Sequence, residues 1–121
     1  MTTLLPNADN AHIDPRKLRD YVLNFGHDLG QYKAAFFAQM GYTADKWQQL
    51  EYDIREQHLH SLAEEGKFSK YGRKYTITAP LQGPNSEQRW VTTVWIIRTG
   101  NDHADLVTIE PAQRQKVNDD G

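Results

Sequence analysis

The segment Trp90-Val91-Thr92-Thr93-Val94-Trp95-Ile96-Ile97-Arg98-Thr99 decides the fold of this chain. Its first eight residues are all β-branched or aromatic, and these residue types are enriched in strands. Both faces of such a strand are largely apolar. We therefore expect it at the centre of a sheet.

Segments on either side of it predict the remaining strands. In residues 75–81 apolar side chains alternate with Lys74, Thr76 and Thr78, as in a strand with one buried face. Glycine-containing turns separate the segments. The expected strands are 74–81, 90–99 and 105–109, with a fourth if 67–71 also pairs.

Three helices are expected before these strands. Asp14-Pro15, Asp28 with Gln31, and Thr43 each form a helix-start signal. The expected helices run from Pro15 to Phe25, from about Leu29 to Met40, and from the Thr43 cap to about Glu65. The third carries an apolar stripe of Trp47, Leu50, Ile54, His58 and Leu62.

This order predicts an α+β fold, with three N-terminal helices packed on one face of a three- to four-stranded antiparallel sheet. Residues 1–13 are expected to form an N-terminal arm, 14–111 a single domain, and 112–121 a flexible tail. The uncovered face would carry Lys74, Thr76 and Thr78, and would therefore be polar and basic.

The composition restricts the classes of function. The 121 residues carry a net charge of −2, so binding to a polyanion requires a local basic patch. There is no cysteine, which excludes disulfides and thiolate metal sites. No apolar run approaches the roughly 18 residues of a membrane span, and we expect a cytoplasmic protein without membrane contact.

The five histidines do not predict a metal site. His58 and His60 are two residues apart, so on a helix they point to different sides. His12 and His103 lie in expected loops without a carboxylate at a metal-ligand spacing. We expect neither a metal nor a cofactor.

The remaining polar residues fit metal-free cleavage of RNA. This reaction needs groups that transfer protons and cations or hydroxyls that hold the phosphate. We assign His27, Lys33, Lys74 and Thr93 as catalytic, and Trp95, Arg98 and Thr108 as substrate-binding. Five of them have a plain alternative: Trp95 as a core residue, Thr93 as a strand residue, the two lysines as surface charges and His27 as a loop residue.

From residue 5 to 111 the chain resembles an uncharacterised bacterial domain family for which no activity is established. The resemblance implies a family and not a function. It rests on Leu5-Pro6-Asn7-Ala8, Ile13-Asp14-Pro15-x-Lys17-Leu18, Tyr21-Val22-Leu23-Asn24, His27-x-x-Gly30-x-x-Lys33-Ala34-x-Phe36-Phe37, Tyr71-Gly72-x-Lys74-Tyr75, Leu81-x-Gly83-Pro84-x-Ser86, Val91-x-Thr93-Val94-Trp95-x-Ile97 and Leu106-Val107-Thr108.

A second, narrower likeness is to the small ribonuclease toxins of the barnase, EndoU, colicin and RelE type. His27, Thr93 and Trp95 carry it, together with helices that precede an antiparallel sheet. The chain departs from the uncharacterised family at Asp28 and at His103-Ala104, where prolines are usual. Asp28 would raise the pKa of His27, which suits an acid better than a base.

Three functions stay open from the sequence. The first is a metal-independent ribonuclease-like domain of toxin type that cleaves RNA by 2′-hydroxyl attack. The second is a non-catalytic protein-interaction module, whose partner would be encoded nearby. The third is a domain that binds a small ligand on its polar sheet face.

Overall fold

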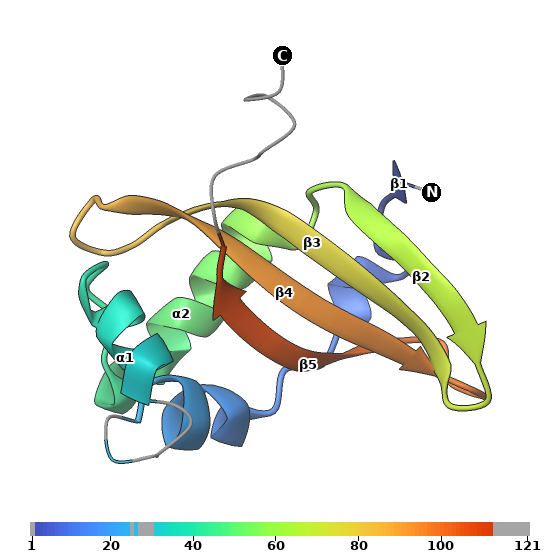
Figure 1. The fold of residues 1–121 in the computed structure, drawn as a ribbon, viewed down its shortest axis with the longest axis horizontal. Coiled ribbons are helices and arrows are strands. Elements are labelled where there is room, and N and C mark those ends of the chain that lie inside the picture. The colour runs from blue at the N-terminus through green and yellow to red at the C-terminus, as the bar shows by residue number, and fades with distance from the viewer. Residues whose placement is uncertain (1, 25, 27–30, 113–121) are drawn as a thin grey trace.

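One antiparallel sheet of five strands dominates the computed structural model, which describes residues 2–24, 26 and 31–112 (Figure 1). The strands lie side by side in chain order. They are β1 Thr2–Thr3, β2 Ala63–Ser69, β3 Gly72–Gln82, β4 Gln88–Arg98 and β5 Ala104–Pro111. The antiparallel pairing is confirmed, but the expected number of three to four strands is wrong.

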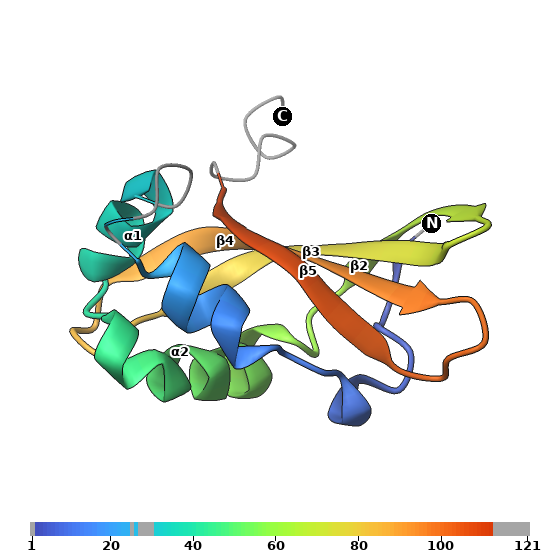
Figure 2. The same ribbon diagram turned by 90° about the horizontal axis from the view of Figure 1, so that it is seen from below.

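The helices are shorter than expected. In chain order they are the 3-10 helix η1 Ala8–Asn10, the π-helix η2 Lys17–Val22, α1 Gln31–Ala38, the 3-10 helix η3 Ala44–Lys46, α2 Trp47–Asp53 and the π-helix η4 Ile54–His58. In Figure 2, α2 lies below the sheet and α1 lies beside one end of it. The prediction of three helices packed on one sheet face is therefore wrong. None of the described helices is long and apolar enough to cross a membrane.

Long-range pairing explains the main error, which concerns the third helix. The chain leaves the helix after His58 and enters β2 at Ala63, which is fully buried and lies opposite Ile77 of β3. Leu62, expected on the apolar stripe, is 63% exposed. The free energy of joining the sheet outweighs the helix propensity of this segment.

The fifth strand comes from the N-terminal segment. Thr2 and Thr3 pair with Glu64 and Ala63, so β1 covers the edge of β2. Two threonines carry no alternating pattern, and the sequence alone therefore gave no sign of this strand.

The core follows the expected alternation. On β3 the side chains of Tyr75, Ile77, Ala79 and Leu81 are buried, while Lys74, Thr76 and Thr78 face the other side of the sheet. β4 pairs with β3 on one side and with β5 on the other, which confirms its interior position.

Gly83, which follows β3, packs closely against Met40, just beyond the end of α1. A Cβ atom on Gly83 would lie 2.1 Å from the carbonyl oxygen of Met40, so only glycine fits here. Asn85 then donates from its side chain to the carbonyl of Gln39 at 2.7 Å. This contact fixes α1 next to the loop between β3 and β4.

Candidate functional site

Two residues predicted from the sequence meet where α1 approaches β5. The ammonium group of Lys33 donates to the hydroxyl oxygen of Thr108 at 3.1 Å. The same ammonium lies 5.0 Å from the ring centroid of Tyr21 on η2, in a cation–π contact. Among the described residues Lys33 has no carboxylate partner.

A cavity of about 220 Å³ lies between η2 and β5, next to this contact. Its lining residues are Arg16, Lys17, Tyr21, Val22, Leu106, Val107, Thr108 and Ile109. We call this cavity together with Lys33 the β5 cleft. Lys17 brings a second cation, which within the described part of the chain has no ion-pair partner.

Arg16 contributes less charge to the β5 cleft than its position suggests. Its guanidinium donates to both carboxylate oxygens of Asp14, at 3.1 and 2.8 Å. These bonds lower the pKa of Asp14 to about 2, so the pair is charged but close to neutral overall. Lys33 and Lys17 are therefore the cations left for a ligand.

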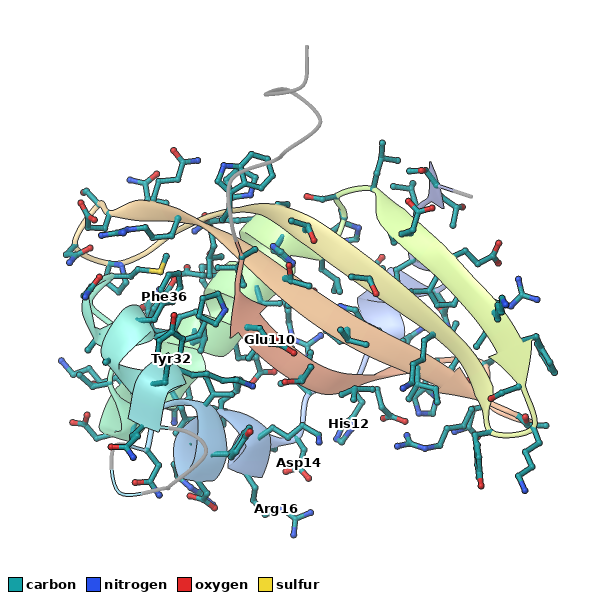
Figure 3. The ribbon with its side chains drawn as sticks, viewed as in Figure 1. His12, Asp14, Arg16, Tyr32, Phe36 and Glu110 are labelled. Atoms are coloured by element: carbon teal, nitrogen blue, oxygen red, sulfur yellow. The ribbon has the colours of Figure 1, made fainter. Side chains whose placement is uncertain are left out.

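A carboxylate lies on the same strand face as Thr108. Glu110 is two residues further along β5, about 7 Å away along the strand, and exposed. In the view of Figure 3, Glu110 lies towards Tyr32 and Phe36 of α1, and Arg16 lies farther away, at the bottom of the picture. The β5 cleft therefore combines two cations and a hydroxyl, and the carboxylate of Glu110 lies on the same strand face as that hydroxyl.

Lys74 and Arg98 are not brought to this cleft. Lys74 lies on β3 opposite Ile96, two strands away from β5, and is exposed. Arg98 ends β4 and donates to the carboxylate of Asp105. The predicted set of site residues is therefore divided between separate parts of the sheet.

Thr93 and Trp95 are fully buried. The indole nitrogen of Trp95 donates to the hydroxyl oxygen of Thr93 at 2.8 Å, and the same oxygen lies 2.9 Å from Nε2 of His58. Burial lowers the pKa of His58 to about 4, while a backbone contact with Ile77 opposes this shift. In this structure the three side chains contact one another in the core and not solvent.

His27 lies outside the described residues, as does Asp28. Its assignment as a proton carrier stays a prediction from the sequence. In sequence it precedes Gln31, the first residue of α1, by four positions.

A charged cluster that was not predicted from the sequence surrounds Asp105. His12 lies 3.1 Å from one carboxylate oxygen of Asp105, His103 lies 4.0 Å from that oxygen, and Arg98 binds the other. The backbone of His12 also bonds to both Ala104 and Leu106 of β5. This cluster holds the segment before η2 against β5. The only sequence signal was a histidine within a turn-rich region, which specifies no partner.

The described residues contain no cluster of three or more His, Asp or Glu side chains that could hold a metal ion.

The sequence itself matches a known family. Residues 4–113 match the family described as Domain of unknown function (DUF6883). The chain belongs to this family. Comparison with curated proteins and with solved structures gave no match. The DUF6883 match covers the β5 cleft but assigns it no activity.

Proposed function

We propose that this DUF6883 domain is a metal-independent, ribonuclease-like domain of toxin type, and that its β5 cleft holds the phosphate of RNA. The observation that carries the proposal is the contact between Lys33 and Thr108, 3.1 Å long and half-buried. An ammonium that has no carboxylate partner within the described part of the chain, and that lies beside a hydroxyl, matches the needs of a phosphodiester, whose charge rises as a nucleophile attacks.

The residues of the cleft have distinct roles in this proposal. Lys33 and Lys17 bind the non-bridging phosphate oxygens, and the Thr108 hydroxyl donates a hydrogen bond to one of them. Glu110 takes the proton from the 2′-hydroxyl. His27, expected to be protonated beside Asp28, gives a proton to the leaving oxygen.

The step balances without a cofactor. The 2′-oxygen forms a bond to phosphorus, and the bond between phosphorus and the 5′-oxygen breaks. Glu110 gains one proton and His27 loses one. The products are a 2′,3′-cyclic phosphate and a free 5′-hydroxyl. The absence of cysteine is compatible with a reducing compartment, and we include a cytoplasmic location in the proposal.

The test is the rate of RNA cleavage in EDTA for the wild type and four variants. Lys33→Ala and Thr108→Val should each lower the rate, roughly 100-fold for the loss of one phosphate donor. Thr108→Ser should retain most of the rate because it keeps the hydroxyl. Lys46→Ala, which removes an exposed lysine of η3, is the matched control and should cleave normally. Unchanged cleavage by Lys33→Ala would overturn the proposal.

One observation favours the protein-interaction alternative. Tyr32 of α1 is 73% exposed beside the cleft, and large exposed aromatic side chains are enriched where proteins bind one another. Size-exclusion chromatography with the product of a neighbouring gene distinguishes the two functions. A stable complex that Tyr32→Ala abolishes, in a protein without nuclease activity, supports an interaction module.

A further inference from the structure

The hairpin between β2 and β3 is the most basic segment of the described chain outside the β5 cleft. Residues 67–74 read Lys-Phe-Ser-Lys-Tyr-Gly-Arg-Lys, with four cations and no carboxylate, in a chain of net charge −2. Lys67, Lys70 and Lys74 are exposed and form no ion pair within the described part of the chain. Their charge is therefore available to a polyanion.

Two aromatic rings lie between these cations and are turned to solvent. Phe68 is 65% exposed and Tyr71 is 67% exposed. Each ring makes a cation–π contact within the hairpin. The guanidinium of Arg73 lies 5.5 Å from the ring centroid of Phe68, and the ammonium of Lys70 lies 5.2 Å from the ring centroid of Tyr71. Exposed aromatic rings among basic side chains are typical of proteins that bind single-stranded nucleic acid.

A groove of about 390 Å³ lies beside the hairpin. Glu65, Phe68, Arg73, Tyr75 and Ile97 line it, together with residues 98–101. Figure 2 shows that this end of the sheet extends beyond α2. We call this cavity the hairpin groove.

We propose that the hairpin groove binds a base of single-stranded RNA, which stacks on Phe68, while Lys67 and Lys70 contact the flanking phosphates. The choice of RNA as ligand rests on the proposed function. The carboxylate of Glu65 already binds Arg73 at 2.7 Å and accepts a hydrogen bond from Tyr75 at 3.3 Å. The negative charge of Glu65 repels a phosphate group but not an uncharged base. We therefore place the base inside the groove and the phosphates outside it, on the lysines.

The test measures binding to a 2′-O-methyl oligonucleotide of about 12 nucleotides, a length within the range that single-strand binding sites cover. This probe cannot be cleaved by 2′-hydroxyl attack, so binding is measured apart from catalysis. Fluorescence anisotropy compares wild type with Phe68→Ala and with Tyr52→Ala. Tyr52→Ala is the control because it removes another exposed aromatic side chain. Tyr52 lies on α2, and 61% of its surface is exposed.

Phe68→Ala should weaken binding about tenfold, as expected for one lost stacking contact, and Tyr52→Ala should not change it. Lys70→Ala should reduce the dependence of log Kd on log salt concentration by about 0.7, the value for one phosphate contact on a single strand. Equal affinities of wild type and Phe68→Ala overturn the inference. So does a wild type that does not bind the probe but forms a dimer that Phe68→Ala abolishes, because the groove then binds a second copy of the chain.

The binding and cleavage results separate the two proposals. A protein that binds the probe through Phe68 but cleaves no RNA refutes only the catalytic role of the β5 cleft. A protein that cleaves RNA through Lys33, with binding independent of Phe68, refutes only the hairpin groove.

Discussion

The buried His58 should make the domain less stable in acid. Burial lowers the pKa of His58 to about 4 from an ordinary value of 6.5, so folding keeps the imidazole neutral. The unfolded chain binds a proton at this residue as the pH falls below about 6.5, whereas the folded chain does so only near 4. The stability contributed by neutral His58 is complete above pH 6.5 and is lost as the pH falls towards 4.

The size of this effect follows from the pKa difference. Each pKa unit corresponds to about 1.4 kcal/mol, so the free energy of unfolding should fall by about 3 kcal/mol across the whole interval. The structural reason is the burial of the imidazole, which is fully covered and would have to hold a charge out of contact with water. Its Nε2 atom lies 2.9 Å from the Thr93 hydroxyl, and the backbone contact with Ile77 offsets only part of the effect of burial.

Urea unfolding followed by tryptophan fluorescence, repeated across this pH interval, measures the effect. His58→Gln removes the titrating group and keeps a nitrogen that can reach Thr93. The variant should therefore lose about 3 kcal/mol less stability than wild type between pH 6.5 and 4. His60→Gln is the matched control, because the side chain of His60 is 59% exposed. The same pH dependence in wild type and His58→Gln would refute the reasoning.

Two further predictions concern single contacts. Tyr42→Phe removes a 2.6 Å bond to the buried carboxylate of Asp53, which among the described side chains then keeps a donor only in Gln49. The free energy of unfolding should therefore fall by about 1–3 kcal/mol in urea titrations, and no change would show that water replaces the bond. Arg16→Ala should raise the pKa of Asp14 from about 2 towards 3.8 in an NMR titration, and a pKa that stays near 2 would contradict the assigned cause.

The strands were the part of the fold that the sequence predicted best. The alternation from Tyr75 to Leu81 and the β-branched run from Trp90 show within each segment which side chains are buried. This pattern is enough to predict a strand. The predicted end of the third helix was wrong because Ala63 pairs in the sheet with Ile77, a residue 14 positions away, and local patterns do not show such pairing. The β1 strand was missed for the same reason: its two residues pair only with a distant segment.

The candidate site was predictable only in part. Lys33 was selected as a phosphate contact and Thr108 as a substrate-binding residue by residue type, and the structure brings them together across 75 positions of sequence. Thr93 was also selected by residue type, but its side chain lies on the face of β4 that packs into the core. Glu110 was not selected, because its relation to Lys33 depends on how α1 packs beside β5. Residue type suggests chemistry, but the register of the strands decides which side chains share a face.

The most direct test of the central claim is the chemistry of the RNA product formed in EDTA. The substrate is a short RNA, compared with the same strand carrying a 2′-deoxy sugar at the cleaved position. The account predicts a 2′,3′-cyclic phosphate from wild type, no product from the 2′-deoxy strand, and strongly reduced product from Lys33→Ala. Cleavage of the 2′-deoxy strand at the normal rate, or a wild-type protein that leaves RNA intact, would contradict it.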